Sequence, residues 1–242
     1  MFKEKIILVT GSSRSLGATI LKKFYEEGAT VIINYNSSED KAHLLNDDLE
    51  DRSMLVKCDV SKEDEVKQMI DSIVEKYGRI DILVNNAGVA NDTLFNEKKK
   101  DDFDRVLSVN LIGTYLVSKH VGEYMLKEKQ GKIINIASDN GIHECYPESC
   151  DYDASKAGVI SLTHNMAKYY APHINVNCVC PGWIDTDMNI GLTEKQKEEI
   201  NKNILLNRFA EKCEIANVVL FLASAKASYV NDSVIVVNGG VK

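Results

Sequence analysis

Two periods of hydrophobic residues alternate along the chain. Short runs rich in apolar and β-branched residues recur at residues 6–9, 30–34, 54–57, 82–84, 132–137, 175–180 and 233–237. Runs of this length and composition are typical of strands that are buried on both faces of a parallel sheet. The pattern therefore predicts a sheet of parallel strands at the centre of the molecule.

Between these runs the apolar residues follow a helical period. Leu16, Ile20, Leu21 and Phe24 share one face of a segment that closes at Gly28. Further helices are predicted at about residues 38–50, 62–77, 101–127, from Tyr152 onward, 187–209 and 216–223. Strands that alternate with helices predict an α/β fold, a Rossmann-type doubly wound parallel sheet with helices on both faces. No linker rich in Pro, Gly or Ser interrupts the pattern, so we expect a single domain over residues 1–242.

Composition and charge exclude several classes of function. The chain has 242 residues, of which 44% are hydrophobic, and only 3 are prolines, as expected of a compact protein. Its formal net charge of −7 argues against a nucleic-acid partner, which needs a basic surface. The longest basic run, Lys98 to Lys100, is followed by Asp101 and Asp102, a pattern typical of a solvated helix entry.

Targeting and metal signals are weak. The first apolar run is too short for the core of a signal peptide, and no run approaches the length of a membrane span. We therefore expect a cytoplasmic protein without a membrane partner. The six cysteines form no C-x-x-C pair and have no histidine at a zinc-binding distance, so we expect buried thiols and no metal site.

Tyr152 and Lys156 are the first candidates for catalysis. They lie four residues apart, which places the phenol and the ammonium on one face of a helix. A cation beside a phenol favours the phenolate, so we expect the pKa of Tyr152 to fall below its usual value of about 10. A tyrosine tuned in this way can act as an acid catalyst. Ordinary helix decoration would also produce this pair, so it needs further support.

The strand that stops at Thr10 and Gly11 leads directly into a helix. Strand, glycine loop and helix together form a phosphate-binding layout, because loop and helix N–H groups carry partial positive charge. Gly11 and Gly17 are only two of the three glycines expected, which makes the pattern alone a weak indication.

Three motifs together resemble the short-chain dehydrogenase/reductase family. The segment Thr10 to Gly17 (TGSSRSLG) is similar to the family's TGxxxGxG cofactor loop, with Ser15 in place of its middle glycine. Residues 85–88 (NNAG) match a second signature of the family, and 181–182 (PG) match a third. The resemblance covers nearly the whole chain and implies hydride transfer between a nicotinamide and a carbonyl or alcohol.

The choice of cofactor depends on the end of the second strand. A dinucleotide fold that uses NAD places an acidic residue there for the ribose hydroxyls, whereas this chain has Asn34. Arg14 in the glycine loop and Ser37 beyond the strand favour a 2′-phosphate, so we expect NADP(H). Arg14 is also explained as a solvated surface charge.

The resemblance assigns further cofactor contacts. Asp59 matches the residue that binds the adenine amino group, although a cap before the helix at 62–77 explains the acid equally well. The complete expected set is Gly11, Ser12, Ser13, Arg14, Ser15, Leu16, Gly17, Asn34, Ser37, Asp59, Val60, Asn86, Ala87, Gly88, Tyr152, Lys156, Pro181, Gly182, Ile184 and Thr186.

Asn110 and Ser138 complete the expected catalytic tetrad with Tyr152 and Lys156. Ser138 follows a strand at its carboxyl end, where open parallel sheets bind ligands. The resemblance implies that Tyr152 donates a proton, Ser138 holds the carbonyl oxygen and Lys156 binds the nicotinamide ribose. It implies that Asn110 holds a water that relays protons to the lysine.

The region after residue 181 is expected to cover the substrate. Trp183 either lines the substrate pocket or fills the core. Residues 187–209 read as a polar helical segment with sparse apolar anchors, which family members use as a mobile lid that excludes water.

Residues 86–94, 181–188 and 236–240 look most like the β-ketoacyl acyl-carrier-protein reductases of the family. That likeness implies a 3-oxoacyl thioester as substrate and acyl carrier protein as partner. Carrier protein is acidic, so docking needs basic residues near the active-site mouth, for which Lys127, Lys129 and Lys132 are candidates. Pro172 stands where those reductases often carry arginine, and the loop 143–148 adds carboxylates.

Two alternatives remain open. The first is an enzyme for a small free carbonyl, sugar or alcohol. The second, of another class, is a nucleotide-sensing or scaffold protein without turnover; Ser15 is its only support, and the intact tetrad argues against it. The resemblance also implies a homotetramer that pairs the long helices carrying Asn110 and Tyr152.

Overall fold

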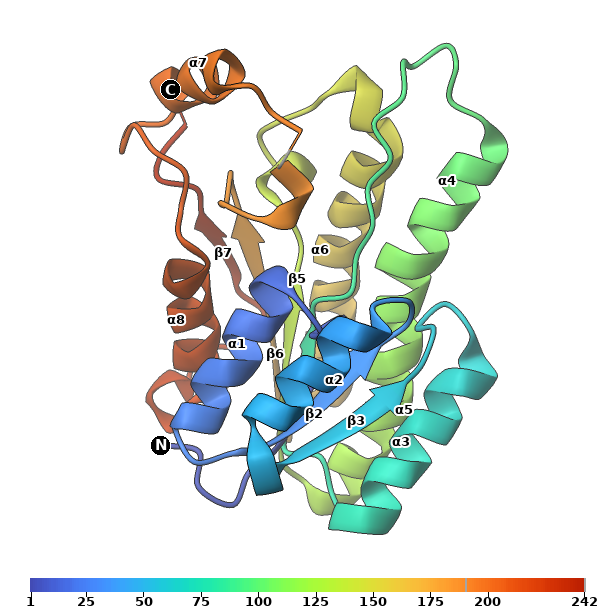
Figure 1. The fold of residues 1–242 in the computed structure, drawn as a ribbon. Helices are drawn as coiled ribbons and strands as arrows, with labels where there is room; N and C mark the ends of the chain where they lie inside the picture. The colour runs from blue at the N-terminus through green and yellow to red at the C-terminus, as the bar shows by residue number, and fades with distance from the viewer. Residues whose placement is uncertain (190, 242) are drawn as a thin grey trace.

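Seven parallel strands form one sheet in the order β3-β2-β1-β4-β5-β6-β7 (Figure 1). The computed structural model describes residues 1–189 and 191–241. The strands are β1 Ile6–Val9, β2 Thr30–Tyr35, β3 Ser53–Lys57, β4 Ile82–Asn85, β5 Gly131–Ile136, β6 Ile174–Pro181 and β7 Val234–Val237. The order reverses between β1 and β4, the place where doubly wound sheets bind nucleotides. The predicted α/β fold is confirmed.

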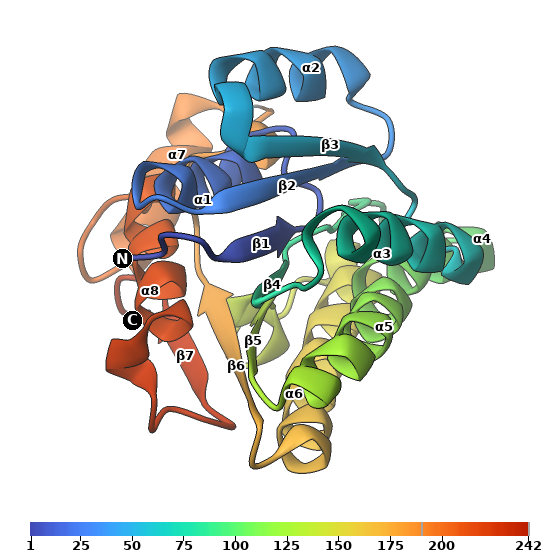
Figure 2. The same ribbon diagram turned by 90° about the horizontal axis from the view of Figure 1, so that it is seen from below.

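Helices cover both faces of the sheet (Figure 2). They are α1 Ser15–Glu26, α2 Glu39–Asp48, α3 Glu63–Tyr77, α4 Lys100–Leu107, α5 Gly113–Glu128, α6 Cys150–Tyr170, α7 Glu194–Asn203 and α8 Lys212–Ala223. Ile20, Leu21 and Phe24 pack on one face with residues of α2 and α8, whereas Ile70, Val121 and Met166 pack on the other. Burial on both faces explains why strands such as β1 are apolar at every position.

The predicted helix at 101–127 is divided in the structure. α4 and α5 are separated by a π-turn at Ser108–Ile112. The apolar period continues across this turn, which is why the sequence reads as one helix. Asn110 lies within the π-turn, and its side chain is fully buried. Such turns occur often at functional sites.

The expected helix over residues 187–209 is only partly present, as α7 and a 3₁₀ turn at Asp187–Asn189. Residues 191–193 and 204–209 form no helix. Ile204 is the anchor: it is buried and pairs with Val241 in an isolated antiparallel bridge. α7 itself lies above the carboxyl ends of the strands (Figure 1). Its polar sequence reflects this exposed position.

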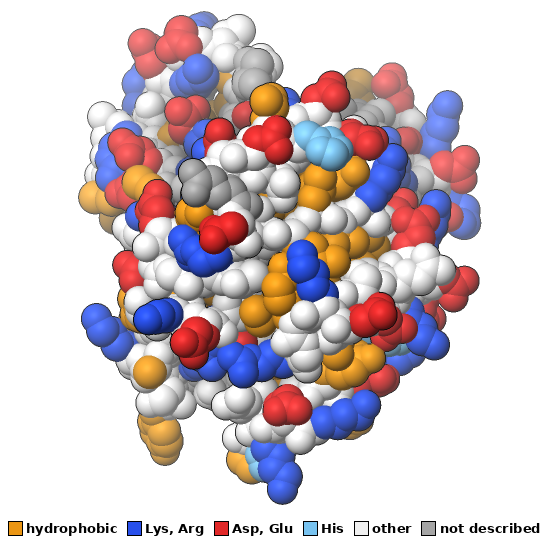
Figure 3. All heavy atoms as spheres, turned by 60° about the horizontal axis from the view of Figure 1, so that its bottom comes forward, with side chains coloured by type: hydrophobic (Ala, Val, Ile, Leu, Met, Phe, Trp, Pro, Cys, Tyr) orange, Lys and Arg blue, Asp and Glu red, His pale blue; other side chains and the backbone are white. Residues whose placement is uncertain are grey.

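Charged side chains of both signs and free thiols are distributed over the described residues. Acidic and basic side chains are interspersed on the face shown in Figure 3. Within residues 1–189 and 191–241, no group of His, Cys, Asp and Glu is placed to hold a metal ion. All six cysteines are free thiols; Cys58, Cys178 and Cys180 are buried as expected, but Cys145 is exposed.

No helix among the described residues is long and apolar enough to cross a membrane.

Close packing of α5 against α6 holds the two helical segments of the site together. The Tyr170 hydroxyl donates to the carbonyl oxygen of Ser118 (2.9 Å) and lies directly over Gly122. A Cβ at residue 122 would lie 2.3 Å from that hydroxyl oxygen, closer than any real contact. Gly122 is therefore required for the approach of the two helices.

We predict that Gly122→Ala lowers the free energy of unfolding by about 2 kcal/mol, because the methyl group overpacks the contact with Tyr170. Urea denaturation followed by circular dichroism measures the change. Gly191→Ala is the matched control, since a Cβ there meets nothing within 4 Å. Equal stability of the two variants would contradict this packing.

Candidate active site

The glycine loop after β1 is bound to the loop after β4 by side-chain hydrogen bonds. The Thr10 hydroxyl accepts from the backbone N–H groups of Asn86 and Ala87, both at 3.0 Å. Asn86 Nδ2 in turn donates to the carbonyl oxygens of Thr10 (2.9 Å) and Gly11 (3.2 Å). The two family signatures thus form one structural unit at the point where the strand order reverses.

The glycine loop has the geometry of a phosphate cradle. Gly11 has a φ of 60°, and a Cβ there would lie 2.9 Å from Ala87 Cα. In the described contacts no side chain at Arg14 caps α1, so the first N–H groups of the helix are available to a ligand. The loop residues therefore fit the pyrophosphate of a dinucleotide.

Ser15 adopts a backbone conformation that favours glycine. Its φ is 52°, in the left-handed region, which costs an L-residue about 1–2 kcal/mol. Ser15 is the residue that replaces the family's middle glycine. The chain therefore keeps the loop conformation and carries strain at this position.

Asn34 holds the loop together. Its Oδ1 accepts from Gly11 N (3.0 Å), and its Nδ2 donates to the Cys58 carbonyl oxygen (3.1 Å). These bonds join the ends of β1, β2 and β3, so the amide has a structural task in addition to the expected cofactor contact. Ser37 is exposed in the loop beyond β2.

Two cations converge on a single carboxylate near this edge. Arg14 Nη1 and Lys41 Nζ lie 3.4 Å and 3.5 Å from Asp187 Oδ2. Lys41 comes from α2 and Asp187 from the segment after β6. The two cations neutralise this carboxylate beside the glycine loop. Lys41 is a residue that the sequence analysis did not identify.

Asp59 and Val60 follow β3. Asp59 Oδ1 accepts from Ser61 N (3.0 Å) and Ser61 Oγ (2.7 Å), so the carboxylate stabilises the turn before α3. This is the structural alternative that the sequence left open. Val60 is buried and packs against Gly113 at the start of α5.

Asn110 connects the loop after β4 to α6. Its Oδ1 accepts from Val89 N (2.8 Å), while its Nδ2 donates to the Val89 carbonyl oxygen (2.9 Å) and to Ser155 Oγ (3.0 Å). A Cβ on Gly88 would lie 3.5 Å from Asn110 Oδ1 and 3.6 Å from Lys156 Nζ. Asn110 and Lys156 therefore approach the same small residue.

Ser138, Tyr152 and Lys156 lie together at the carboxyl end of β5. Lys156 Nζ is buried, donates to the Ile136 carbonyl oxygen (2.8 Å) and sits over the Tyr152 ring, 5.5 Å from its centroid. The Ser138 hydroxyl hydrogen-bonds the phenol. All four expected tetrad residues thus meet in one place.

The pKa of Tyr152 is raised, whereas the helical spacing of Lys156 led us to expect a lowered value. Burial raises the pKa of Tyr152 to about 12, against the lowering effect of the Ser138 hydrogen bond, and Asp153 and Asp92 raise it further. Burial also lowers the pKa of Lys156 to about 8. Desolvation outweighs the effect expected from helical spacing, because Lys156 is buried and Tyr152 is partly buried.

The loop that precedes α4 is tied to the start of α6 by a buried ion pair. Lys98 Nζ lies 2.7 Å from Asp151 Oδ1, with side chains only 3% and 0% exposed. The same ammonium donates to the Asn91 carbonyl oxygen (2.6 Å). The charge pattern predicted a solvated helix entry that includes Lys98, and for this residue the prediction is wrong. Lys98 holds the loop beside Tyr152.

The segment after β6 forms an aromatic side of the site. Pro181, the last residue of β6, and Ile184 are buried, and a Cβ on Gly182 would lie 2.7 Å from Asn238 Cβ. Thr186 is half-buried two residues further. Trp183 stacks on Phe209 with centroids 5.6 Å apart and meets Tyr146 edge-on at 6.2 Å. Trp183 thus joins the expected lid to the loop before α6.

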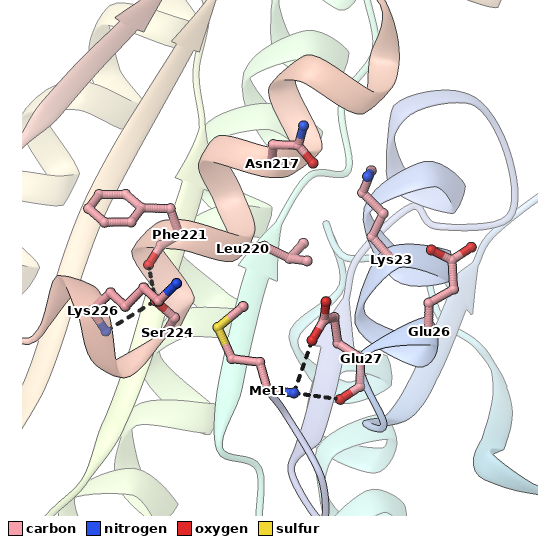
Figure 4. Close-up of a pocket in the computed structure, with 9 residues that line it drawn as sticks. All are labelled: Met1, Lys23, Glu26, Glu27, Asn217, Leu220, Phe221, Ser224 and Lys226. Atoms are coloured by element: carbon pink, nitrogen blue, oxygen red, sulfur yellow. Dashed lines mark hydrogen bonds and ion pairs between the residues drawn. The ribbon is translucent and has the colours of Figure 1, made fainter.

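A shallow hollow elsewhere on the surface is not this site. It lies between α1 and α8 and is lined by residues such as Lys23, Glu26, Asn217 and Phe221 (Figure 4). Lys23 and Glu26 lie at the end of α1 that is opposite the glycine loop, and Asn217 and Phe221 lie on α8. The Met1 amino group binds the Glu27 carboxylate there (2.9 Å).

Known proteins share these features over nearly the whole chain. A family described as “Enoyl-(Acyl carrier protein) reductase” matches residues 11–242. Proteins named 3-oxoacyl-[acyl-carrier-protein] reductase FabG from Staphylococcus epidermidis and Thermotoga maritima are each 41% identical. The alignments cover 98% of this chain and 99% and 97% of those proteins. A variant of the Serratia marcescens short-chain dehydrogenase/reductase superposes with a TM-score of 0.92 at 31% identity, covering 99% of this chain and 98% of that one.

The chain belongs to the short-chain dehydrogenase/reductase family. It is therefore an oxidoreductase that acts on a CH–OH group or a carbonyl. A dehydrogenase/reductase from Sinorhizobium meliloti has the same fold, with a TM-score of 0.92 and 31% identity over 98% of this chain and 95% of that one.

Several residues at this dehydrogenase/reductase site carry no linear signal. Lys41, Asn140 and Asp153 lie outside the family motifs, and the contacts of Lys41 with Asp187 and of Asn140 with Asp153 join different elements. Tertiary contact alone reveals these roles.

We predict that Ser15→Gly raises the free energy of unfolding by about 1 kcal/mol, because glycine removes the left-handed strain while adding some freedom to the unfolded chain. Urea denaturation measures this change. Ser37→Gly, in the exposed loop beyond β2, is the control and is expected to leave stability unchanged or slightly reduced. Destabilisation by Ser15→Gly would contradict the strain.

We predict that Lys156→Met stabilises the fold at pH 7 by about 2 kcal/mol, at the expense of activity. The folded-state pKa of about 8 lies below the unfolded value of about 10.4, so the unfolded chain binds more protons in that window. The free energy of unfolding of the wild type therefore rises relative to that of the variant as the pH increases from 8 to 10. Urea denaturation at pH 7 and pH 10 measures the difference, and a constant gap would contradict the assigned pKa.

Proposed function

We propose that this chain reduces the carbonyl of a 3-oxoacyl thioester to a hydroxyl, with NADPH as the reductant. The observation that carries the proposal is the meeting of Ser138, Tyr152, Lys156 and Asn110 beside the glycine loop. The similarity to proteins named 3-oxoacyl-[acyl-carrier-protein] reductase, which extends over nearly the whole chain, supports this substrate class. Acyl carrier protein is the corresponding partner.

Each tetrad residue has a task that its environment supports. A raised pKa keeps Tyr152 protonated at neutral pH, the form that donates a proton to the developing alkoxide. Ser138, hydrogen-bonded to the phenol, holds the carbonyl oxygen. Lys156, with a pKa of about 8, is mostly charged at pH 7 and binds the nicotinamide ribose. When bound, the nicotinamide supplies the hydride.

Asn110 has two tasks in this proposal. Its hydrogen bonds to Val89 fix the loop after β4, where Gly88 lets the backbone approach a ribose. Its position near Lys156 suits a proton relay to that lysine. The amide stands in the π-turn, an irregularity that is frequent at functional sites.

The preference for NADP(H) rests on Arg14 and Lys41. Their convergence on one carboxylate oxygen supports a binding position for a 2′-phosphate. The neutral Asn34 at the end of β2 leaves no carboxylate there to repel that phosphate. The expected contacts of the glycine loop, Asp59 and residues 181–186 belong to the same proposal.

Docking of the carrier protein needs a different basic surface from the one expected. Lys127, Lys129 and Lys132 lie at the end of α5 and the start of β5, whereas Ser138 follows the carboxyl end of β5. They therefore lie at the opposite edge of the sheet from the tetrad. Pro172, after the end of α6, lies at that far edge as well. A carrier protein that reaches Tyr152 of the same chain does not touch these residues.

A smaller free carbonyl compound is the second candidate substrate. The carboxylates of Asp92 and Asp153 lie close enough to Tyr152 to raise its pKa, and exposed Glu144 hydrogen-bonds the Tyr146 hydroxyl nearby. Negative charge at this position disfavours an acidic partner. It leaves neutral ketones, sugars and alcohols unaffected.

Two further properties belong to the proposal. A homotetramer is supported by exposed apolar side chains on α5, α6 and α8, among them Tyr115, Tyr169 and Phe221. Light scattering that shows a stable monomer would contradict it. We also place the protein in the cytoplasm, where NADPH and acyl thioesters are available to a protein of this family.

The test follows NADPH absorbance with acetoacetyl-coenzyme A as substrate, beside a panel of free ketones. We predict rapid oxidation by the wild type and a loss of at least about 10³-fold in kcat for Tyr152→Phe, which keeps the ring but removes the proton. NADPH binding by the variant is the control. Turnover of free ketones alone would select the second candidate, and no turnover at all would contradict both.

We predict that Arg14→Ala and Lys41→Ala each raise the KM for NADPH about fivefold and leave the KM for NADH unchanged, because NADH lacks the 2′-phosphate. The expected effect is modest because both cations are solvent-exposed. Lys22→Ala is the matched control: this lysine on α1 pairs only with Asp48 in the described contacts. Equal effects on both cofactors would contradict the assigned 2′-phosphate position.

A further inference from the structure

Asn140 holds the hydroxyl of Ser138 from two sides. The backbone N–H of Asn140 donates to Ser138 Oγ (3.3 Å), and Ser138 Oγ donates to Asn140 Oδ1 (3.3 Å). Both bonds are long and therefore weak. The N–H group can anchor the Ser138 oxygen atom while the hydroxyl turns its hydrogen bond from Asn140 Oδ1 to a substrate oxygen.

The orientation of the Asn140 amide is fixed by Asp153. Asn140 Nδ2 donates to Asp153 Oδ1 at 2.8 Å, a charge-assisted hydrogen bond. A carboxylate accepts and never donates when it is ionised. The amide must therefore turn its NH₂ group toward Asp153, and its Oδ1 toward Ser138.

Asp153 is itself held firmly next to Tyr152. Its Oδ2 accepts from Tyr146 N (2.9 Å), its Oδ1 accepts from Ser149 Oγ (3.1 Å), and the side chain is buried. Asp153 follows Tyr152 on α6, and its hydrogen bond with Asn140 fixes the turn after β5 relative to that helix. The chain of contacts runs from the Tyr152 segment through Asp153 and Asn140 to Ser138.

We propose that Asn140 is a positioning residue that aims the Ser138 hydroxyl at the reacting carbonyl, with its own orientation set by Asp153. The inference rests on the proposed carbonyl reduction. It assigns to a residue outside the family motifs the task of keeping Ser138 and Tyr152 in register. Misplacement of a catalytic group by about 1 Å costs on the order of 100-fold in rate, so a contact of this kind governs kcat.

A pair of substitutions separates this task from general folding. In Asn140→Asp two carboxylates face each other and repel, which breaks the link to Ser138. Combining it with Asp153→Asn restores a hydrogen bond of reversed polarity, because the amide at 153 donates to the carboxylate at 140. The remaining amide oxygen accepts from Tyr146 N, and the Ser149 hydroxyl can accept the second amide hydrogen.

The experiment compares single-turnover rates of the wild type, both single variants and the double variant, each normalised to NADPH-binding sites. We expect Asn140→Asp to reduce the rate on the order of tenfold or more with an unchanged KM for NADPH, and the double variant to recover most of the loss. Asn165→Ala, an exposed amide on α6 bonded only to Ser161 in the described contacts, is the matched control.

The result that overturns the proposal is an Asn140→Asp rate within twofold of the wild type, or a double variant that binds NADPH and recovers nothing. Loss of NADPH binding by Asn140→Asp also overturns it, because the role would then be structural. Crystal structures of Asn140→Asp and the double variant decide the matter even if no carbonyl is reduced. The proposal requires Ser138 Oγ to move in the first and return in the second.

Discussion

The site depends on side chains that replace the backbone hydrogen bonds lost where parallel strands end. Thr10 and Asn86 bind the loop after β1 to the loop after β4, and Asn34 binds the ends of β2 and β3 to the same glycine loop. Asn110 continues the connection to α6. Each link is a short polar side chain at the carboxyl edge of an apolar sheet. The hydrophobic strands form the rigid scaffold, and the polar side chains at their ends fix the positions of the loops.

Catalytic capacity and stability oppose each other at the centre of this edge. The Lys156 ammonium is buried among thiols, a tyrosine and backbone, and desolvation lowers its pKa to about 8. Ser15 adds strain in the cofactor loop. Both features destabilise the fold, and the large apolar cores on the two faces of the sheet offset them. Strain of this kind is expected where function constrains the backbone.

The sequence predicted the parts of the molecule that depend on local pattern. The strands are continuous apolar runs, so their positions and the α/β fold followed from periodicity, and the glycine loop and the Tyr152–Lys156 pair followed from spacing. The π-turn at Asn110 was not predictable in this way, because five residues of altered hydrogen bonding leave the apolar period nearly intact. The polar composition of residues 187–209 likewise suggested more helix than α7 contains.

Electrostatic properties were the least predictable from sequence. Helical spacing places Lys156 beside Tyr152 but says nothing of burial, which decides the direction of both pKa shifts. The basic run at Lys98 looked solvated, whereas its partner Asp151 lies far away in the chain. Lys41 and Asn140 were invisible for the same reason: their partners Asp187 and Asp153 meet them only in the folded protein.

A crystal structure of the protein with NADP⁺ would show whether one edge of the sheet holds both the cofactor and the tetrad. We expect the pyrophosphate against the Ser12 to Leu16 backbone and the nicotinamide ribose on Lys156. We expect the 2′-phosphate between Arg14 and Lys41. A nicotinamide turned away from Tyr152, or a cofactor bound elsewhere, would contradict this arrangement.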